Sequence, residues 1–319
     1  MSAAVIEISD LTKKYGAFTA VDKLSLPIGK GEVFGLLGPN GAGKSTTILM
    51  LMGLSESDSG SVKVCSINPE RNPIGVKQKV GYLPEDVGFY DELTGLENLM
   101  FTARLNSISG AEAQKRSLQL LKRVGLSTDM HKKVGKYSRG MRQRLGLADV
   151  LIKNPEVIIL DEPTLGIDPT GVKAFLELIV QLSKEDGITV LFSSHHLHQV
   201  QQVCDRVGIF VKGRLLAEGN VDSLAKQLFN SGAYTIEVGL MANENAMHPT
   251  LLDKVKSLES VESVEVNDTI WRIECTQDIA HEISKTIVES GVGLSHLYKK
   301  EYGLDDIYHR YFEGGNEDE

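Results

Sequence analysis

The sequence predicts an α/β fold with a largely parallel sheet, followed by a smaller α+β domain. Up to about residue 220, short apolar runs alternate with segments of helical periodicity. The strand-like runs are continuously apolar, which is typical of strands buried on both faces of a parallel sheet. Beyond residue 233 the order of segments changes, and this indicates a second domain.

Composition indicates an ordinary globular protein. The chain has 319 residues, 41% of them hydrophobic, and 34 Lys+Arg against 43 Asp+Glu give a net charge of −9. An acidic chain is a poor general match for nucleic acid, and no run approaches the ~18–20 apolar residues of a membrane span. The N-terminus lacks a signal-peptide pattern, and the three cysteines are far apart. We therefore expect a cytoplasmic setting, with the cysteines reduced and buried as small hydrophobes.

The first part of the chain contains predicted elements in alternating order. The expected strands and helices are, in chain order, strands at 5–8 and 33–37, helices at 94–107 and 111–124, a helix capped by Ser138, a strand at 157–160, a helix at 170–184, a strand at 188–193, a helix at 196–203 and strands within 207–218.

The second part has the order β-α-β-β-α-β of a ferredoxin-like domain. Its expected segments are a strand at 234–238, a helix at 250–258, strands at 261–266 and 270–275, a helix at 278–290 and a strand at 293–297. A short helix at 304–312 precedes an acidic tail, 314–319, that we expect to be disordered. The predicted domains are therefore 1–228 and 229–313.

A glycine-rich loop between a strand and a helix matches the pattern G-x-x-x-x-G-K-[ST]. Glycines let the backbone turn its N–H groups toward phosphates, at the positive end of a helix. Lys44 would reach the β- and γ-phosphates, and Ser45 would place its hydroxyl on Mg²⁺. The predicted nucleotide-binding residues of this loop are Gly38, Pro39, Asn40, Gly41, Ala42, Gly43, Lys44, Ser45 and Thr46.

Two adjacent carboxylates follow the apolar strand at 157–160. A carboxylate at a strand end can hold Mg²⁺, and a neighbouring carboxylate can activate water. The pattern alone also fits a core strand that ends at the surface. Beside a phosphate-binding loop, we interpret Asp161 as the metal-side acid and Glu162 as the general base.

The segment Tyr137-Ser138-Arg139-Gly140-Met141-Arg142-Gln143-Arg144 resembles the LSGGQ signature of the ATP-binding-cassette (ABC) ATPases. With the other motifs in order, the resemblance covers about residues 5–220. Tyr137 and Arg139 depart from the family pattern, in which Leu and Gly are usual. The resemblance implies a cassette with a RecA-like core, an antiparallel β part and a helical subdomain at about 92–150. It also implies that Ser138 and Gly140 contact ATP held by the partner of a homodimer.

The resemblance assigns further residues to the site. Tyr15 matches the aromatic that stacks on adenine, and Glu85 occupies the Q-loop, where most members carry Gln, as a ligand of Mg²⁺ or water. Leu165-Gly166-Ile167-Asp168 corresponds to the D-loop, a contact of the dimer, and His195 matches the switch histidine that senses the γ-phosphate. A metal site at His195 and His198 is the alternative, but no nearby carboxylate or cysteine completes a ligand set.

The resemblance implies an ATPase subunit of a transporter, using ATP and Mg²⁺, and docked on a separate membrane permease at the cytoplasmic face. Its branch resembles ABC-2-type drug exporters, with a weaker likeness to the ATPase subunit of the nitrous-oxide-reductase copper-maturation transporter, carried by 81–93 and 304–311. An acidic and aromatic patch over 85–92 would receive the permease. No direct nucleic-acid contact is expected. A soluble ABC ATPase acting on ribosomes or DNA is the alternative, and the sequence leaves the transported substrate open.

Overall fold

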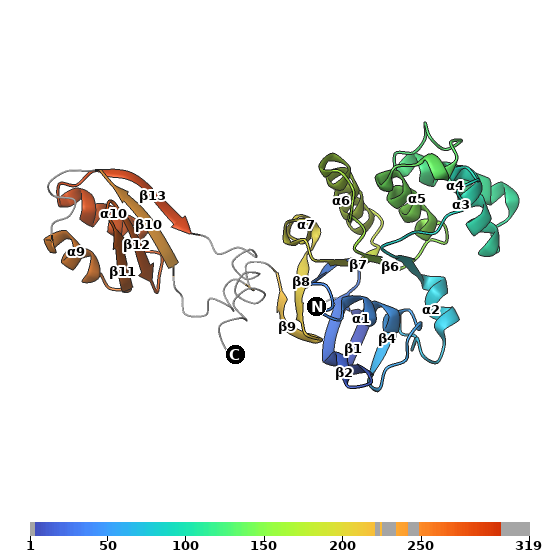
Figure 1. Cartoon of the computed structure of the whole chain (residues 1–319), viewed down its shortest axis with the longest axis horizontal. Helices are drawn as coiled ribbons and strands as arrows, with labels where there is room; N and C mark the ends of the chain where they lie inside the picture. Colours follow the sequence, from blue (N-terminus) through green and yellow to red (C-terminus); the bar gives the residue numbers. More distant parts are fainter. Residues whose placement is uncertain (1–3, 221–223, 225–233, 242–248, 301–319) are drawn as a thin grey trace. The chain divides into compact units, whose positions relative to one another are not determined.

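The computed structural model describes residues 4–220, 224, 234–241 and 249–300. The chain divides into two compact units, Met1–Asn220 and Val221–Glu319 (Figure 1). The predicted domain boundary at 228–229, the predicted helix at 304–312 and the acidic tail lie outside the described residues.

A six-stranded sheet forms the centre of the first unit, in the order β5-β6-β7-β3-β8-β9 (Figure 1). The strands β3, β5, β6, β7 and β8 pair in parallel, and β9 pairs antiparallel to β8. Every residue of β3, β6 and β7 is buried, so the continuous apolar runs were correctly interpreted. The strands span Val33–Leu37 (β3), Val80–Leu83 (β5), Val157–Asp161 (β6), Thr189–Ser194 (β7), Arg206–Val211 (β8) and Arg214–Gly219 (β9).

Parallel pairing brings the ends of three central strands to one edge of this sheet. Leu37 of β3 is aligned with Ser194 of β7, and Asp161 of β6 is aligned with Ser193. The segments that leave these strands therefore meet at the same place, where an α/β sheet commonly binds its ligand. The helices that follow are α1 (Lys44–Leu51), α6 (Pro169–Lys184) and α7 (Leu197–Val203).

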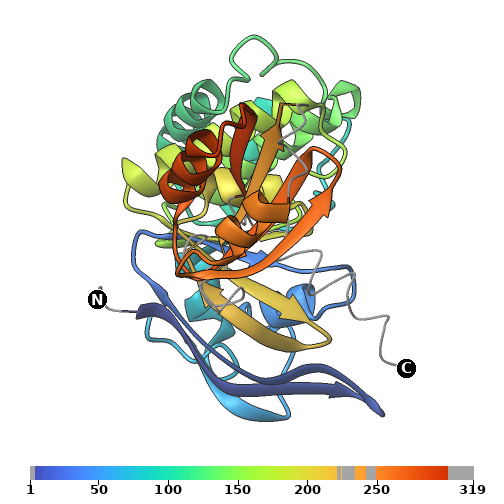
Figure 2. The same ribbon diagram turned by 90° about the vertical axis from the view of Figure 1, so that its left-hand side faces the viewer.

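A separate antiparallel sheet has the order β2-β1-β4 (Figure 2). It consists of β1 (Ala4–Tyr15), β2 (Phe18–Gly29) and β4 (Ser59–Val64). The predicted strand at 5–8 is too short, because a bulge near Asp10, at φ 48°, shifts the inward-facing position from Ile8 to Leu11. The strands β2 and β4 were not predicted, although Leu24, Leu26 and Ile28 alternate inward along β2.

A helical region follows β5. Its elements are α3 (Gly95–Leu105), α4 (Gly110–Arg123), a 3₁₀ turn (Val134–Lys136) and α5 (Arg139–Leu151), and α2 (Pro73–Lys79) precedes β5. The helix α3 begins with a capping box between Thr94 and Glu97. Ser138 caps α5, as the sequence predicts, by accepting a hydrogen bond from the Met141 N–H at 3.3 Å.

The second unit has the predicted β-α-β-β-α-β order. Its sheet is antiparallel throughout, in the order β11-β12-β10-β13, which is the ferredoxin-like arrangement. Residues from both helices and from the central strands share one hydrophobic core, which contains Trp271 and Ile283. The elements span Tyr234–Leu240 (β10), Pro249–Lys256 (α9), Val261–Asn267 (β11), Ile270–Cys275 (β12), Ala280–Glu289 (α10) and Leu294–Lys300 (β13).

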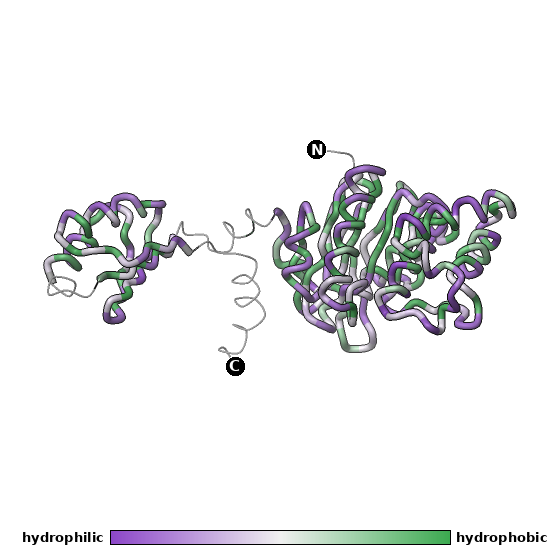
Figure 3. Tube along the Cα trace, turned by 90° about the horizontal axis from the view of Figure 1, so that it is seen from above, coloured by the Kyte–Doolittle hydropathy of each residue, from purple (hydrophilic) through white to green (hydrophobic). Residues whose placement is uncertain are grey.

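Hydrophobic residues are concentrated in the interior strands of each unit, while the connecting turns are largely polar (Figure 3). Within the described ranges, no helix combines the length and the apolarity that crossing a bilayer requires.

The three cysteines are free thiols. Cys65 and Cys275 are buried, and burial raises the pKa of each to about 11. Burial also raises the pKa of Cys204, whose sulfur packs against Gly35 on β3. Since the thiolate is the reactive form, all three side chains fit the role of small hydrophobes.

We expect native protein to react slowly with iodoacetamide at pH 8 at all three positions. At a pKa of about 11, only about a thousandth of a thiol is ionised at that pH. In guanidinium chloride the burial is lost, and all three thiols should react at the rate of a free cysteine. Mass spectrometry after timed quenching measures both rates, and rapid labelling of Cys275 in the native protein would contradict the buried position.

Candidate functional site

The phosphate-binding loop runs from the end of β3 to the start of α1. Gly43 adopts φ 106°, and a Cβ there would lie 2.3 Å from the Ala20 carbonyl oxygen, so only glycine fits. Gly43 is also the N-cap of α1, and no side chain caps this end. The first N–H groups of α1 therefore remain available to an anion, at the positive end of the helix.

This loop forms one wall of a pocket of about 250 Å³. The pocket brings together the predicted loop except Gly38, the predicted adenine contact, the Q-loop acid and the predicted base. It is lined by Tyr15, Phe18, Ala20, Pro39, Asn40, Gly41, Ala42, Gly43, Lys44, Ser45, Thr46, Glu85 and Glu162.

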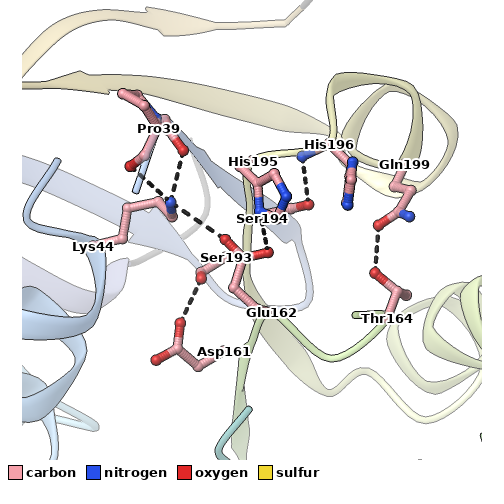
Figure 4. Close-up of polar contacts among 11 residues, drawn as sticks. Pro39, Lys44, Asp161, Glu162, Thr164, Ser193, Ser194, His195, His196 and Gln199 are labelled. Atoms are coloured by element: carbon pink, nitrogen blue, oxygen red, sulfur yellow. Dashed lines mark hydrogen bonds and ion pairs between the residues drawn. The ribbon is translucent and has the colours of Figure 1, made fainter. Parts of the chain in front are cut away.

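Lys44 is buried at the floor of the site (Figure 4). Its Nζ donates to the carbonyl oxygens of Gly38, at 2.6 Å, and Pro39, at 3.2 Å. The same ammonium lies 3.3 Å from Glu162 Oε1, and that oxygen makes no hydrogen bond. The positive charge is thus held beside the loop amides by a carboxylate and two carbonyl groups.

Glu162 follows β6 directly and has φ 47°, an uncommon conformation for a residue with a side chain. Its Oε2 lies 2.9 Å from His195 Nδ1 (Figure 4). Glu162 is therefore placed between Lys44 and His195, with one carboxylate oxygen toward each. The predicted base and the predicted switch histidine come together although 33 positions separate them in the chain.

Asp161 is buried next to Glu162 and contacts a different group. Its Oδ1 accepts a hydrogen bond from Ser193 Oγ at 2.6 Å, on the neighbouring strand β7. Burial and the negative charge of Asp161 raise the pKa of Tyr82 to about 12, so this tyrosine stays neutral at pH 7. Asp161 adjoins the pocket through the strand ends and is not among its lining residues.

Two aromatic side chains flank the outer part of the pocket. Tyr15 and Phe18 are paired across the β1–β2 turn and are 52% and 61% exposed. The Lys13 Nζ lies 5.3 Å from the centre of the Tyr15 ring, which adds a positive charge beside it. Phe18 was not predicted as part of the site, and the available signal is an aromatic residue directly across a tight turn from Tyr15.

The Q-loop acid, Glu85, is exposed and lines the pocket. Its backbone oxygen accepts a hydrogen bond from the side-chain amide of Gln143 at 3.0 Å, and Gln143 is a buried residue of α5. Gln143 was not predicted to have a role, because its partner lies 58 positions away in the chain. It fixes the Q-loop to the helix that carries the signature.

Besides Gly38 and Asp161, three predicted binding residues lie outside this pocket. Ser138 and Gly140 are at the start of α5, and Asp168 is at the start of α6. The Asp168 carboxylate caps its helix by accepting a hydrogen bond from the Gly171 N–H at 2.9 Å. None of the three contributes to the phosphate loop of the same chain.

His196 follows the predicted switch histidine, His195, and makes different contacts. The ring centres of His195 and His196 are 4.0 Å apart, and the His196 N–H donates to Ser194 Oγ at 2.9 Å. Burial, with a smaller contribution from His195, lowers the pKa of His196 below its usual value, which favours the neutral ring. In the described part of the chain, no three His, Cys, Asp or Glu side chains are grouped to hold a metal ion.

The fold and this site define a P-loop ATPase of the cassette type. The family model described as "ABC transporter" matches residues 21–165. A bacitracin transport ATP-binding protein of Bacillus licheniformis, BcrA, is 36% identical over 313 residues, which are 98% of this chain and 99% of that protein. A linearmycin resistance ATP-binding protein of Bacillus subtilis, LnrL, is 37% identical and covers 85% of each chain.

Solved structures agree with this assignment. A dimeric ATP-binding cassette in a post-hydrolysis state with ADP and Pi is similar, with a TM-score of 0.62, 27% identity and coverage of 67% of this chain and 98% of that one. An ATP-binding subunit of an ABC transporter has a TM-score of 0.64, 31% identity and coverage of 71% and 93%. The chain belongs to the ABC transporter family, as an ATP-binding subunit that hydrolyses ATP.

We expect Tyr15→Ala to weaken ATP binding by about tenfold, because the substitution removes the exposed aromatic ring that would stack on adenine. Phe18→Ala should have a smaller effect, of about twofold to threefold. Fluorescence titration with a labelled ATP analogue measures both affinities. Phe101→Ala, which changes an exposed aromatic of α3 outside the pocket, is the control. Equal affinity for wild type and Tyr15→Ala would exclude Tyr15 as the adenine contact.

Proposed function

We propose that two copies of this chain form a homodimer that docks on a membrane permease at the cytoplasmic face and drives export. The observation that carries the hydrolysis step is the cluster of Lys44, Glu162 and His195 at the phosphate loop, and the dimer, the permease and export are proposed from the relatives. This cluster places a cation, a carboxylate and an imidazole where the γ-phosphate and the attacking water would lie. The soluble alternative, with ribosomes or DNA as partner, is not favoured by relatives named for transport and resistance.

Binding begins in the pocket of one chain. Tyr15 stacks on adenine, and the loop amides contact the phosphates. Lys44 exchanges the carbonyl oxygens of Gly38 and Pro39 for the β- and γ-phosphates. Glu162 orients a water molecule and accepts its proton, and His195, already 2.9 Å from Glu162, contacts the γ-phosphate. The end of the adjacent strand already fixes the position of each of these side chains.

The donor set suits Mg²⁺, which prefers oxygen ligands. The Ser45 hydroxyl and the Glu85 carboxylate line the pocket, and the Asp161 carboxylate lies beside Glu162 at the end of β6. We assign these three residues to hold the ion. When bound, Mg²⁺ neutralises charge on the β- and γ-phosphate oxygens.

The signature completes the site from the other chain. Ser138 and Gly140 lie at the start of α5 and outside the pocket of their own chain, which supports a role in trans. The N–H groups in the first turn of α5 that the Ser138 side chain does not cap, together with the Ser138 hydroxyl, can bind the γ-phosphate held by the partner. Asp168 belongs to the loop that contacts the partner. Closure of the dimer is then a two-state change that ATP favours.

The transported compound is proposed from the relatives. The bacitracin transport protein is similar over almost the whole of both chains, including the second unit. The linearmycin resistance protein is a second relative named for an antibiotic. We assign antibiotics as the class of compound that is exported, and the permease selects the individual compound.

We expect Glu162→Gln to bind ATP normally and to hydrolyse it about 10²- to 10³-fold more slowly, because the amide cannot accept the proton. With ATP and Mg²⁺ the variant should accumulate as a dimer. Phosphate release and size-exclusion chromatography measure the two effects. Glu185→Gln, at an exposed carboxylate just past α6, is the matched control. Near-normal turnover by Glu162→Gln would place the base elsewhere.

The predicted docking patch, residues 85–92, carries less unpaired negative charge than its sequence indicates. Asp91 pairs with Arg142 at 2.6 Å, and Glu92 pairs with Lys133 at 2.7 Å, so two carboxylates already have cationic partners in the same chain. Apolar side chains are exposed beside the remaining acids Glu85 and Asp86: Tyr90 is 56% exposed and packs edge-to-face on Phe101, and Leu105 on α3 is 70% exposed. We therefore propose that apolar contact dominates docking of the permease.

We expect Leu105→Ser combined with Tyr90→Ala to release the chain from membranes that contain its permease, because the exposed apolar area is lost. Ile74→Ser is the matched control, since Ile74 is 69% exposed and lies on α2. Flotation of membrane fractions followed by immunoblotting measures retention. Full retention of the double variant, with the purified protein still hydrolysing ATP, would contradict this surface.

A further inference from the structure

Arg139 occupies the signature position at which glycine is usual in the family, and its side chain contacts two other loops of its own chain. A Cβ on Gly166 would lie 2.7 Å from Arg139 Cδ and 2.9 Å from Nε, so the arginine stem lies directly on the Gly166 backbone. At its far end, Arg139 Nη2 is 3.9 Å from Asp86 Oδ1. One side chain thus spans from the D-loop to the Q-loop.

Neighbouring residues of α5 strengthen both contacts. On the D-loop side, a Cβ on Gly140 would lie 3.3 Å from Ile167 Cγ2, so the first turn of α5 packs closely on Ile167. On the Q-loop side, the Gln143 side-chain amide donates to the Glu85 carbonyl oxygen at 3.0 Å. The start of α5 therefore contacts both loops twice, and Arg139 is the residue that contacts both.

The D-loop is connected to the catalytic cluster through short contacts. The Leu165 N–H donates to the Glu162 carbonyl oxygen at 3.2 Å. Thr164 is buried, and its hydroxyl donates to Gln199 Oε1 at 2.5 Å, on the helix α7 that follows the switch histidine (Figure 4). A displacement of Gly166 is therefore resisted by Leu165, which is bonded to Glu162, and by Thr164, which is bonded to α7.

We propose that Arg139 is a positioning residue for hydrolysis. Its stem holds the D-loop and its guanidinium holds Asp86, so that the signature, the D-loop and the Q-loop keep one arrangement. The inference rests on the proposed function, in which Glu162 is the base. Arg139 does not line the nucleotide pocket of its own chain, so its loss changes turnover and leaves ATP binding in that pocket unaltered. Because the ion pair is long and exposed, packing of the stem carries most of the effect.

Four variants separate the stem from the charge. We expect Arg139→Gly, which removes both, to lower kcat about tenfold with KM for ATP within twofold of wild type. Arg139→Lys keeps a long stem and a charge, and should stay within twofold of wild type. Arg139→Met and Asp86→Asn should each lower kcat about twofold, and the double variant should lose no more than either, because both remove the same contact.

The measurement is steady-state phosphate release by the purified full-length chain over a range of ATP and protein concentrations, with equilibrium ATP binding measured separately. Arg104→Met, at an exposed arginine of α3, is the control for loss of a surface charge. Wild-type kcat in Arg139→Gly would overturn the inference. An equal rise of KM in Arg139→Met would also overturn it, since that result indicates direct contact with nucleotide.

Failure of this inference and failure of the proposed function are distinguishable. If wild type hydrolyses ATP, Glu162→Gln is inactive and every Arg139 variant matches wild type, then Arg139 has no positioning role and the assignment of the base stands. If Glu162→Gln retains turnover, the base is wrong whatever Arg139 does. Retained activity in Arg139→Lys would show that the site folds, and a larger loss in Arg139→Gly than in Arg139→Met would show that the stem matters.

Discussion

The buried ion pair between Lys44 and Glu162 is the interaction on which the arrangement of the site depends. The two side chains are 5% and 10% exposed, and a buried charge left without its partner costs several kcal/mol. Lys44 begins the helix after β3, and Glu162 follows β6, with β7 between these strands in the sheet. The pair therefore forms only if the strand ends reach the same edge, and parallel pairing through β7 brings them there.

Other contacts extend outward from this pair. The strand β7 contributes Ser193 to Asp161 and leads into His195, which faces Glu162. The Thr164–Gln199 hydrogen bond then joins the segment after Glu162 to α7. Single side-chain contacts thus join loops that carry different motifs and that leave the strands of one sheet. These contacts give a continuous packed path along which a displacement at the phosphate loop could be transmitted to the surfaces proposed for the partners.

The phosphate loop, Asp161, Glu162 and His195 could be predicted from the sequence because each is part of a motif whose residues are close together in the chain. In the phosphate loop, positive φ angles favour glycine at Gly41 and Gly43, and Lys44 stands at the first turn of a helix. His195 was predicted only from its match to the switch histidine of the ABC family. Phe18 and Gln143 could not be predicted in the same way. Gln143 gains its position from the Glu85 carbonyl oxygen, 58 positions away in the chain, and nothing local in the sequence specifies that partner. Phe18 is paired with Tyr15 across the β1–β2 turn, a local signal that belongs to none of the motifs.

The sequence by itself determined the class of fold, the order of the second unit's elements and the pattern of the phosphate-binding loop, because periodicity and short motifs are properties of neighbouring residues. Only the tertiary structure decided the length of β1, where a bulge at Asp10 breaks the alternation. It also decided that Asp91 and Glu92 are paired within the chain. Bulges, ion pairs and packing across loops depend on residues brought together by folding, and a linear pattern carries no record of those distances.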